Sequence, residues 1–396
     1  MPLRRGGSLE CRPACAYLGR IQAMTSGGQI DGAIPESASV DTPTQIADRD
    51  NRRRLAEDIS RNEAIREQSR SEFDELTRQT QRGDRGAKTR RRMREAASRL
   101  QSAEAQLEQL HPIGKALDGP TRPKFLMLYE PDGHRQMHAV ISVGDPDTAA
   151  TVSVTIPGVD TDSRSLPGMV FEAVQLHRAV KEILTSEARP ASTATIAWLG
   201  YDPPLDAVET RRIIDAWNMA TTRRAREAAP NLAEFLSGIR QNNPTGRLSL
   251  LGHSYGSLAA SLALQMLKSK KADCAPQVVS SAVFYGSPGL VIDRVDELGL
   301  PENSAYIMRT SDDPTVNYFA AHTKLHFWGT NPYEIDGIEE LSTKEGEDPK
   351  GAHHQAASGH AGYPRLVKGK DGKDVLSTAG YNIAAIVAGF PELAIR

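Results

Sequence analysis

A serine lies between two glycines at the point where an apolar run gives way to a helical one. The stretch reads RLSLLGHSYGSLAASLALQ over residues 247–265, with Gly252 and Gly256 two positions on either side of Ser254. A strand that turns sharply into a helix crowds its backbone, and glycines remove the side chains that would clash there. We therefore interpret Ser254 as a nucleophile raised at the end of a buried strand, rather than as a serine in an ordinary turn.

The elements that must hold this serine alternate between β and α from about residue 117. Strands are predicted at 124–130 and 135–143, as a hairpin, and at 151–156, 193–199, 247–251, 277–285, 305–309 and 337–342. Helices are predicted over 170–180, over 206–240 with an interruption at Pro230, over 255–269 and over 375–389. This alternation predicts a mostly parallel sheet with helices on both faces. In such folds the site lies in the loops at the C-terminal ends of the strands.

The motif GHSYGS at 252–257 resembles the nucleophile elbow of α/β-hydrolases. More narrowly, the chain resembles an actinobacterial α/β-hydrolase family catalogued as a domain of unknown function, DUF1023. The matching stretches are GDPDTAATVSVTIPGVDT, IAWLGYDPP, APNLAEFLSGI, GHSYGS, YGSPG, DDPT and GHAGYP, in the expected order over most of 120–396. The resemblance implies an α/β-hydrolase fold and a serine mechanism, and it says little about the substrate.

A serine hydroxyl is weakly nucleophilic at neutral pH and needs a base, which an acid in turn orients. In α/β-hydrolases the chain order is serine, acid, histidine. Asp312 and Asp313 directly follow the predicted strand 305–309, where the acid belongs. Asp313 precedes Pro314 and matches the family's Asp-Pro, so we assign the acid to Asp313 and keep Asp312 as the alternative.

Five histidines follow the acid: His322, His326, His353, His354 and His360. His360 lies in SGHAGYP, between the last predicted strand and the C-terminal helix, where a base can reach back to Ser254. We assign the base to His360, with His353 and His354 as alternatives in the same loop. His322 and His326 have a helical i, i+4 spacing, but no H-E-x-x-H pattern joins them, so we expect no metal and no organic cofactor.

Two backbone donors must stabilise the oxyanion that forms when the serine attacks. We expect one to be the N–H of Tyr255, next after the serine, and the other the N–H of Val159 in the PGVDT loop after strand 151–156. Three further residues are predicted to line the substrate, or else to pack or form a turn: Tyr201, Asp202 and His253.

The N-terminal part of the chain has a different character. Residues 1–42 are rich in Gly, Ser, Pro and Thr and are predicted to be disordered, with Met24 as an alternative start. Residues 43–116 are predicted to form a coiled-coil-like helical hairpin, because apolar residues recur every three or four positions from Met93 to Leu110 and RGDRGAK interrupts the pattern. We expect 117–396 to form the catalytic domain and to fold without the hairpin, whose 43–110 helices would serve self-association or a protein partner.

Composition excludes several classes of function. The net charge is −2 and no aromatic residues alternate with the basic segment 88–94, so we expect no nucleic-acid partner. Three cysteines cannot build a disulfide framework. No apolar run is long enough for a membrane span and no secretory signal is visible, so a cytoplasmic location is predicted, with non-Sec export left open.

Together these residues predict a serine hydrolase that acts on a small-molecule acyl ester through an acyl-enzyme. Ser254 would attack, His360 would carry the proton and Asp313 would orient the imidazole. Acyl transfer to an alcohol would use the same residues. A protein of another class, which binds partners through the helical hairpin and uses the α/β part as a scaffold, is the rival hypothesis.

Overall fold

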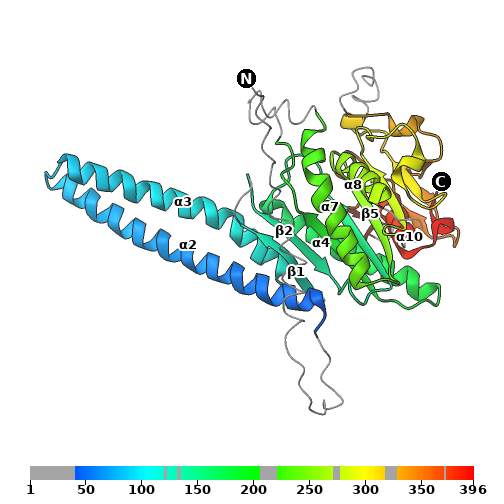
Figure 1. Cartoon of the computed structure of the whole chain (residues 1–396), viewed down its shortest axis with the longest axis horizontal. Helices are drawn as coiled ribbons and strands as arrows, with labels where there is room; N and C mark the ends of the chain where they lie inside the picture. Colours follow the sequence, from blue (N-terminus) through cyan, green and yellow to red (C-terminus); the bar gives the residue numbers. More distant parts are fainter. Residues whose placement is uncertain are drawn as a thin grey trace, which may run out of the picture.

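The computed structural model describes residues 41–119, 123–131, 135–205, 221–270, 277–316, 328–369 and 372–396. Its centre is an eight-stranded sheet in the order β1-β2-β4-β3-β5-β6-β7-β8 (Figure 1). The strands are β1 Lys124–Glu130, β2 His138–Val143, β3 Thr151–Ile156, β4 Thr193–Leu199, β5 Arg247–His253, β6 Ser281–Tyr285, β7 Ala305–Met308 and β8 Glu339–Glu340. β1 pairs antiparallel with β2 and β2 with β4, and the other pairs are parallel. The predicted mostly parallel sheet is confirmed.

Two layers of helices cover the sheet, as expected for strands that are apolar on both faces. Helices α7 Arg223–Asn242 and α8 Gly256–Lys270 share one hydrophobic cluster with the sheet face that carries Leu250 and Phe284. Helices α4 Leu166–Ser186 and α10 Thr378–Ala388 cover the opposite face, which carries Leu251 and Tyr285. Because side chains alternate along a strand, neighbouring positions of β5 serve different layers.

The N-terminal helices form a long hairpin that projects from the α/β part (Figure 1). They are α2 Pro43–Gln81 and α3 Ala87–Leu117. The break at 82–86 lies where RGDRGAK predicted it, and Gly83 there has a φ of 107°. Along most of its length the hairpin buries small side chains and a few leucines between its own helices. These buried residues include Leu76, Ala96, Ala103 and Leu107.

The base of this hairpin belongs to the core of the α/β part. Leu110, Ile113 and Leu117 of α3 share one hydrophobic cluster with β1, β2, β4 and α4. The edge strand β1 is also covered by polar groups of α2, because Asp48 Oδ1 accepts from Leu126 N at 2.6 Å and Asn51 Nδ2 donates to Leu126 O at 2.9 Å. An edge strand left open exposes unpaired backbone groups, so α2 caps the sheet. This packing argues against a boundary at residue 117.

Smaller elements complete the fold and several of them were not predicted. The missed strands are the two-residue pair β9 Gly346–Glu347 and β10 His353–His354, and the pair β11 Leu366–Lys368 and β12 Asp374–Leu376. Short 3₁₀ turns are η1 Ser163–Ser165, η2 Val295–Leu298, η4 Pro332–Glu334 and η5 Pro391–Leu393. Such short strands carry too few residues for a detectable alternation.

One predicted interruption is wrong. Helix α7 continues through Pro230, although a proline removes one helical hydrogen bond. The apolar face of α7, with Leu232, Leu236 and Ile239 buried against the sheet layer, holds the helix together across that position. The other predicted helical residues of this region, 206–220, lie outside the described residues, as do 1–40, His322 and His326.

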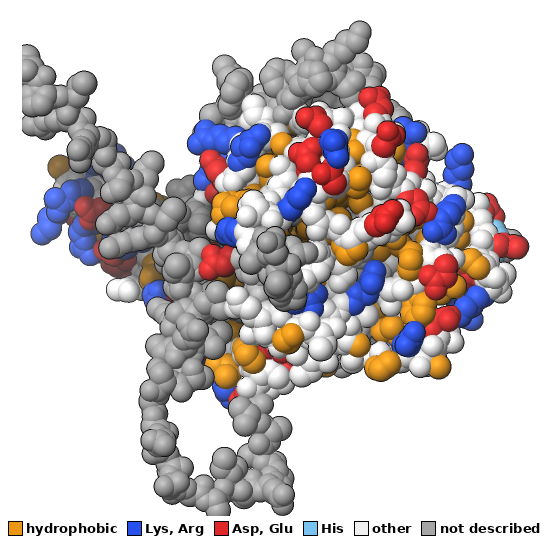
Figure 2. Space-filling model, turned by 45° about the vertical axis from the view of Figure 1, so that its right-hand side comes forward, with side chains coloured by type: hydrophobic (Ala, Val, Ile, Leu, Met, Phe, Trp, Pro, Cys, Tyr) orange, Lys and Arg blue, Asp and Glu red, His pale blue; other side chains and the backbone are white. Residues whose placement is uncertain are grey.

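The surface mixes charges of both signs with scattered hydrophobic side chains on the face seen in Figure 2. Among the described residues, no helix is both long enough and apolar enough to cross a bilayer.

Candidate active site

The turn between β5 and α8 places Ser254 as the glycine spacing predicted. Ser254 has a φ of 51°, which is rare for a residue with a side chain and typical of a strained turn. A Cβ on Gly252 would lie 2.8 Å from Ser257 Cα, and one on Gly256 would lie 2.4 Å from Ile156 O. Both glycines are therefore required by close backbone approach, one from the first turn of α8 and one from the end of β3.

Three residues that are far apart in the sequence meet at this turn. His360 Nε2 lies 2.8 Å from Ser254 Oγ, and His360 Nδ1 lies 2.9 Å from Asp313 Oδ2. Because a carboxylate only accepts, Nδ1 carries the proton, and the unprotonated Nε2 faces the serine hydroxyl. The imidazole is thus held in the tautomer that can accept a proton from Ser254.

Asp313 is fully buried and has several donors around its carboxylate. Tyr363 OH donates to Oδ2 at 2.7 Å, and the backbone N–H groups of Thr315 and Val316 donate to Oδ1. Burial alone would raise the pKa of Asp313, but the contact with His360 and these donors outweigh it and lower the pKa below its usual value. The carboxylate therefore stays charged opposite the imidazole. Tyr363 was not predicted, although the GHAGYP stretch places it three residues after His360.

Asp312, the alternative acid, faces a different part of the same loop. Its carboxylate accepts from Gly359 N at 2.8 Å and from Ser358 Oγ at 2.5 Å. These two bonds lower its pKa to about 2. Gly359 has a φ of 70°, a conformation that favours glycine. Asp312 thus holds the turn that delivers His360, and it does not contact the imidazole ring.

The loop after β3, which carries the predicted oxyanion donor Val159, approaches Ser254 closely. A Cβ on Gly158 would lie 2.7 Å from Ser254 Cβ and 3.1 Å from Ser254 Oγ, so the backbone itself touches the nucleophile. Val159 follows directly and is partly buried against the core. Tyr255, whose N–H is the other predicted donor, follows the serine, and its ring points away into the α7 layer, where its hydroxyl donates to Thr221 O at 2.6 Å.

Tyr201 and Asp202, predicted either to contact substrate or to form a turn, both bond to other parts of the protein. Tyr201 is 3% exposed, stacks on Trp198, and donates its hydroxyl to Pro157 O at 2.6 Å. It therefore anchors the loop that carries Gly158. A second bond, from Asp160 N to Pro204 O at 2.8 Å, ties the same two loops together.

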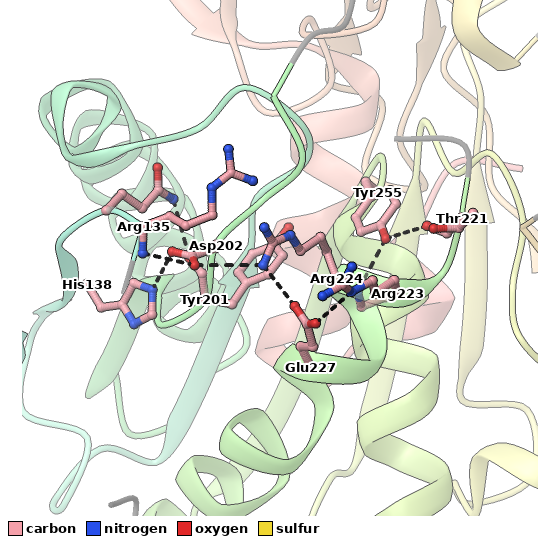
Figure 3. Close-up of polar contacts among 11 residues, drawn as sticks. Arg135, His138, Tyr201, Asp202, Thr221, Arg223, Arg224, Glu227 and Tyr255 are labelled. Carbon is pink, nitrogen blue, oxygen red and sulfur yellow. Dashed lines mark hydrogen bonds and ion pairs between the residues drawn. The ribbon is translucent and has the colours of Figure 1, made fainter. Parts of the chain in front are cut away.

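Asp202 joins a polar network beside that loop (Figure 3). Its carboxylate contacts His138 Nε2 at 3.2 Å, accepts from Arg135 N at 3.2 Å, and lies 3.9 Å from Arg224 Nη1. Burial works against the charge of Asp202, but His138 and the Arg135 amide outweigh it and lower its pKa. This network fixes the loop after β4 against β2 and α7, which is a structural role.

His253 adjoins the nucleophile and packs behind it. Its ring stacks on Tyr285, and its Nε2 donates to His360 O at 2.8 Å, since a carbonyl only accepts. Burial, and then the charge of His360, lower the pKa of His253 to about 4, so the ring is neutral at physiological pH. It also lines a cavity under the site.

The alternative bases lie elsewhere in the described structure. His353 Nε2 is 2.6 Å from Glu345, and His354 Nε2 is 3.2 Å from Asp348. Both therefore have partners of their own. Among the described residues, no group of three or more His, Cys, Asp or Glu side chains could hold a metal ion.

Comparison with known proteins places the chain in a family. The sequence profile of a family described as alpha/beta hydrolase matches residues 132–323. An uncharacterized protein of Mycobacterium tuberculosis is 32% identical over 230 residues, which cover 57% of this chain and 79% of that protein. The chain belongs to the α/β hydrolase family. A second uncharacterized M. tuberculosis protein is 27% identical over 236 residues, which are 58% of this α/β hydrolase and 33% of that protein.

Solved structures resemble this α/β hydrolase more remotely. A carboxyl esterase from the fungus Tuber melanosporum has 12% identity over 70% of this chain and 89% of its own, with a TM-score of 0.33. A serine hydrolase without a lid, from Xanthomonas campestris, has 16% identity over 56% of this chain and 84% of its own, with a TM-score of 0.27.

Proposed function

We propose that this α/β hydrolase is a serine esterase that cleaves carboxylic esters through an acyl-enzyme. The observation that carries the proposal is the alignment of His360 between Ser254 Oγ, at 2.8 Å, and Asp313 Oδ2, at 2.9 Å. Both distances lie within hydrogen-bond reach, which is the geometric requirement for a nucleophile, its base and the residue that orients the base.

The residues would act in two steps. In the first, Ser254 Oγ bonds to the ester carbonyl carbon while its proton moves to His360 Nε2, and the bond to the alcohol oxygen breaks as that proton passes to the leaving alkoxide. In the second, the oxygen of water bonds to the acyl carbon while a proton of that water moves to His360 Nε2, and the bond to Ser254 Oγ breaks as the proton passes from His360 to Ser254 Oγ. Asp313 stabilises the charged imidazole in both steps.

The developing oxyanion would be stabilised by the N–H groups of Tyr255 and Val159. The close approach of Gly158 to Ser254 supports this assignment, because it brings the start of that loop into contact with the nucleophile. The bond from Tyr201 to Pro157 O would hold the loop in place without touching the substrate.

Labelling with a fluorophosphonate probe tests the proposal. We expect the probe to modify Ser254 alone, and we expect Ser254→Ala to lose both labelling and hydrolysis of p-nitrophenyl acetate. Ser269→Ala is the matched control, because Ser269 is an exposed serine on the same helix α8. Labelling that persists in Ser254→Ala would refute the assignment of the nucleophile.

A further inference from the structure

A cavity of about 240 Å³ lies on the α4 and α10 side of the sheet, directly behind the proposed catalytic residues. Its floor is formed by side chains of β3 to β6 that face this layer, which include Ala197, Leu251 and Tyr285. Its walls come from the first turns of α4, with Met169 and Ala173, and from the loop after His360. The lining is mainly apolar, which is typical of a small-molecule site.

Two of the lining residues are chain neighbours of proposed catalytic residues, and a third belongs to the loop that carries Val159. His253 precedes Ser254, Ala361 follows His360, and Pro157 precedes Gly158. A Cβ on Gly158 would lie 3.1 Å from Ser254 Oγ, so the loop that begins at the lining residue Pro157 approaches the serine hydroxyl. The cavity therefore borders the segments that carry Ser254, His360 and Val159.

The opposite end of the cavity carries polar and exposed apolar groups. Glu172 lines it with its side chain 33% exposed, and its Oε1 lies 3.8 Å from Arg365 Nε. Phe171, beside Glu172, is 55% exposed, and Val375, beside the lining residue Leu376, is 36% exposed. Among the described residues the only other large hydrophobic side chain that is exposed is Ile46, so two of the three are chain neighbours of residues that line this cavity.

We propose that this cavity binds the acyl chain of the substrate and selects esters of short, uncharged acyl groups. The inference rests on the proposed function. A cavity of about 150 Å³ with an aliphatic lining holds a benzene ring, so about 240 Å³ accommodates a chain of up to about eight carbons. A charged acyl group is disfavoured, because only Glu172 and Arg365 offer charges, and they already pair with each other.

Chain-length profiles test this assignment. We expect kcat/KM of the wild type on p-nitrophenyl esters, from acetyl to dodecanoyl, to rise about fourfold per buried methylene and to level off near octanoyl. Ala173→Leu should fill the cavity and move the plateau to chains about two carbons shorter. Met169→Ala should enlarge it and move the plateau to longer chains. Shifts of opposite sign cannot come from a general loss of stability.

Two further variants secure the comparison. Gly238→Leu is the matched control, because its Cβ meets no atom within 4 Å, it lies in α7, and it does not line the cavity. Its profile should match that of the wild type. Gly168→Leu replaces Ala173→Leu if the latter fails to fold, because Gly168 lines the cavity and a Cβ there also meets no atom within 4 Å. Equal profiles for the cavity variants and Gly238→Leu would overturn the inference.

The same set of proteins separates this inference from the proposed function. If the fluorophosphonate labels Ser254 and the profiles do not shift, the acyl site is refuted and the esterase stands. If Ser254 is not labelled and no ester is cleaved, the esterase is refuted, and ligand binding alone then tests the cavity. Titration of Ser254→Ala with 2-octanone, an uncharged eight-carbon molecule, measures binding in the cavity without any turnover. Binding should weaken at least tenfold when Ala173→Leu is added to Ser254→Ala, and it should not change when Gly238→Leu is added. Equal binding in those two double variants would refute the acyl site on its own.

Discussion

The adjacent carboxylates of Asp312 and Asp313 have different contacts, which give them different proposed roles. Asp313 is buried against the His360 ring. Asp312 instead accepts hydrogen bonds from Ser358 and from the backbone of Gly359, in the loop that precedes His360. An amide at position 313 can present its NH₂ group to Nδ1, which favours the wrong imidazole tautomer. An amide at position 312 loses only part of a loop contact.

We therefore expect Asp313→Asn to lower kcat on p-nitrophenyl acetate at least about a hundredfold. Asp312→Asn should lower kcat less than about tenfold, because its loop still carries the bond from Thr310 Oγ1 to Gly359 O. Steady-state kinetics of both variants, with thermal unfolding to confirm that each is folded, provide the measurement. A larger loss in Asp312→Asn than in Asp313→Asn would reassign the acid.

Glu172 makes the protein less stable as the pH rises, whereas a carboxylate in an ion pair makes a protein more stable as the pH rises. Burial beside the cavity raises its pKa to about 7, and Arg365 offsets part of that effect. The folded protein therefore binds this proton more tightly than the unfolded chain does. By linkage, its contribution is neutral below about pH 4.5 and becomes destabilising as the pH rises toward 7.

Glu172→Gln should remove this dependence. After a discount for partial exposure, we expect the variant to gain about 1–2 kcal/mol over the wild type when both are moved from pH 4.5 to pH 8. Urea unfolding of both proteins at the two pH values measures the double difference, and Glu182→Gln, at an exposed position of the same helix, is the control. Parallel curves for wild type and Glu172→Gln would contradict the raised pKa.

The base and the distal half of the helical hairpin differ in their packing, and only the base is buried against the sheet. Leu110, Ile113 and Leu117 are buried with β1, β2 and α4, and each such side chain contributes about 1.5–3 kcal/mol by burial. Their sum is comparable to the whole stability of an ordinary domain. The distal half packs only against itself and is joined by exposed ion pairs, such as Arg70 with Glu104, which contribute little.

We therefore expect a chain that starts at Leu117 to be insoluble or unfolded. A chain in which residues 68–106 are replaced by a short glycine-serine linker should keep a cooperative unfolding transition and near-complete ester hydrolysis. Circular dichroism and the p-nitrophenyl acetate assay on both chains decide. A soluble, active chain from Leu117 would show that 117–396 is independent after all.

Across the whole molecule, sequence patterns predicted the candidate site residues more readily than the contacts that surround them. Glycine spacing around Ser254 and strand-to-helix alternation have local causes, so the turn at Ser254 and the mostly parallel sheet could be predicted. The capping of β1 by Asp48 and Asn51 could not, because the contacts join positions about 75 residues apart with no shared pattern. For the same reason the sequence leaves open whether Tyr201 lines the substrate or forms a turn, because its partner Pro157 lies on another loop.

The distribution of apolar surface over the molecule predicts its oligomeric state. The helical stripe that suggested self-association through 43–110 is used within the hairpin, where Leu55, Leu76 and Leu107 are all under 5% exposed. A stable dimer needs roughly 1,200 Å² or more of complementary surface with an apolar centre. Ile46, Phe171 and Val375 are the only exposed large hydrophobic side chains among the described residues. The face seen in Figure 2 carries charges of both signs among its hydrophobic side chains.

We therefore expect the chain to be a monomer of 43.1 kDa, without dimerisation through the hairpin. Sedimentation velocity at several concentrations, at low and high salt, provides the measurement, because exposed ion pairs weaken with salt whereas apolar contacts do not. The chain with residues 68–106 replaced is the control and should also be monomeric. A dimer in the full chain that disappears in this control would show that the distal hairpin carries an interface. Such a dimer would form by exchange of helices between two hairpins, because the apolar residues of the hairpin are packed in its interior.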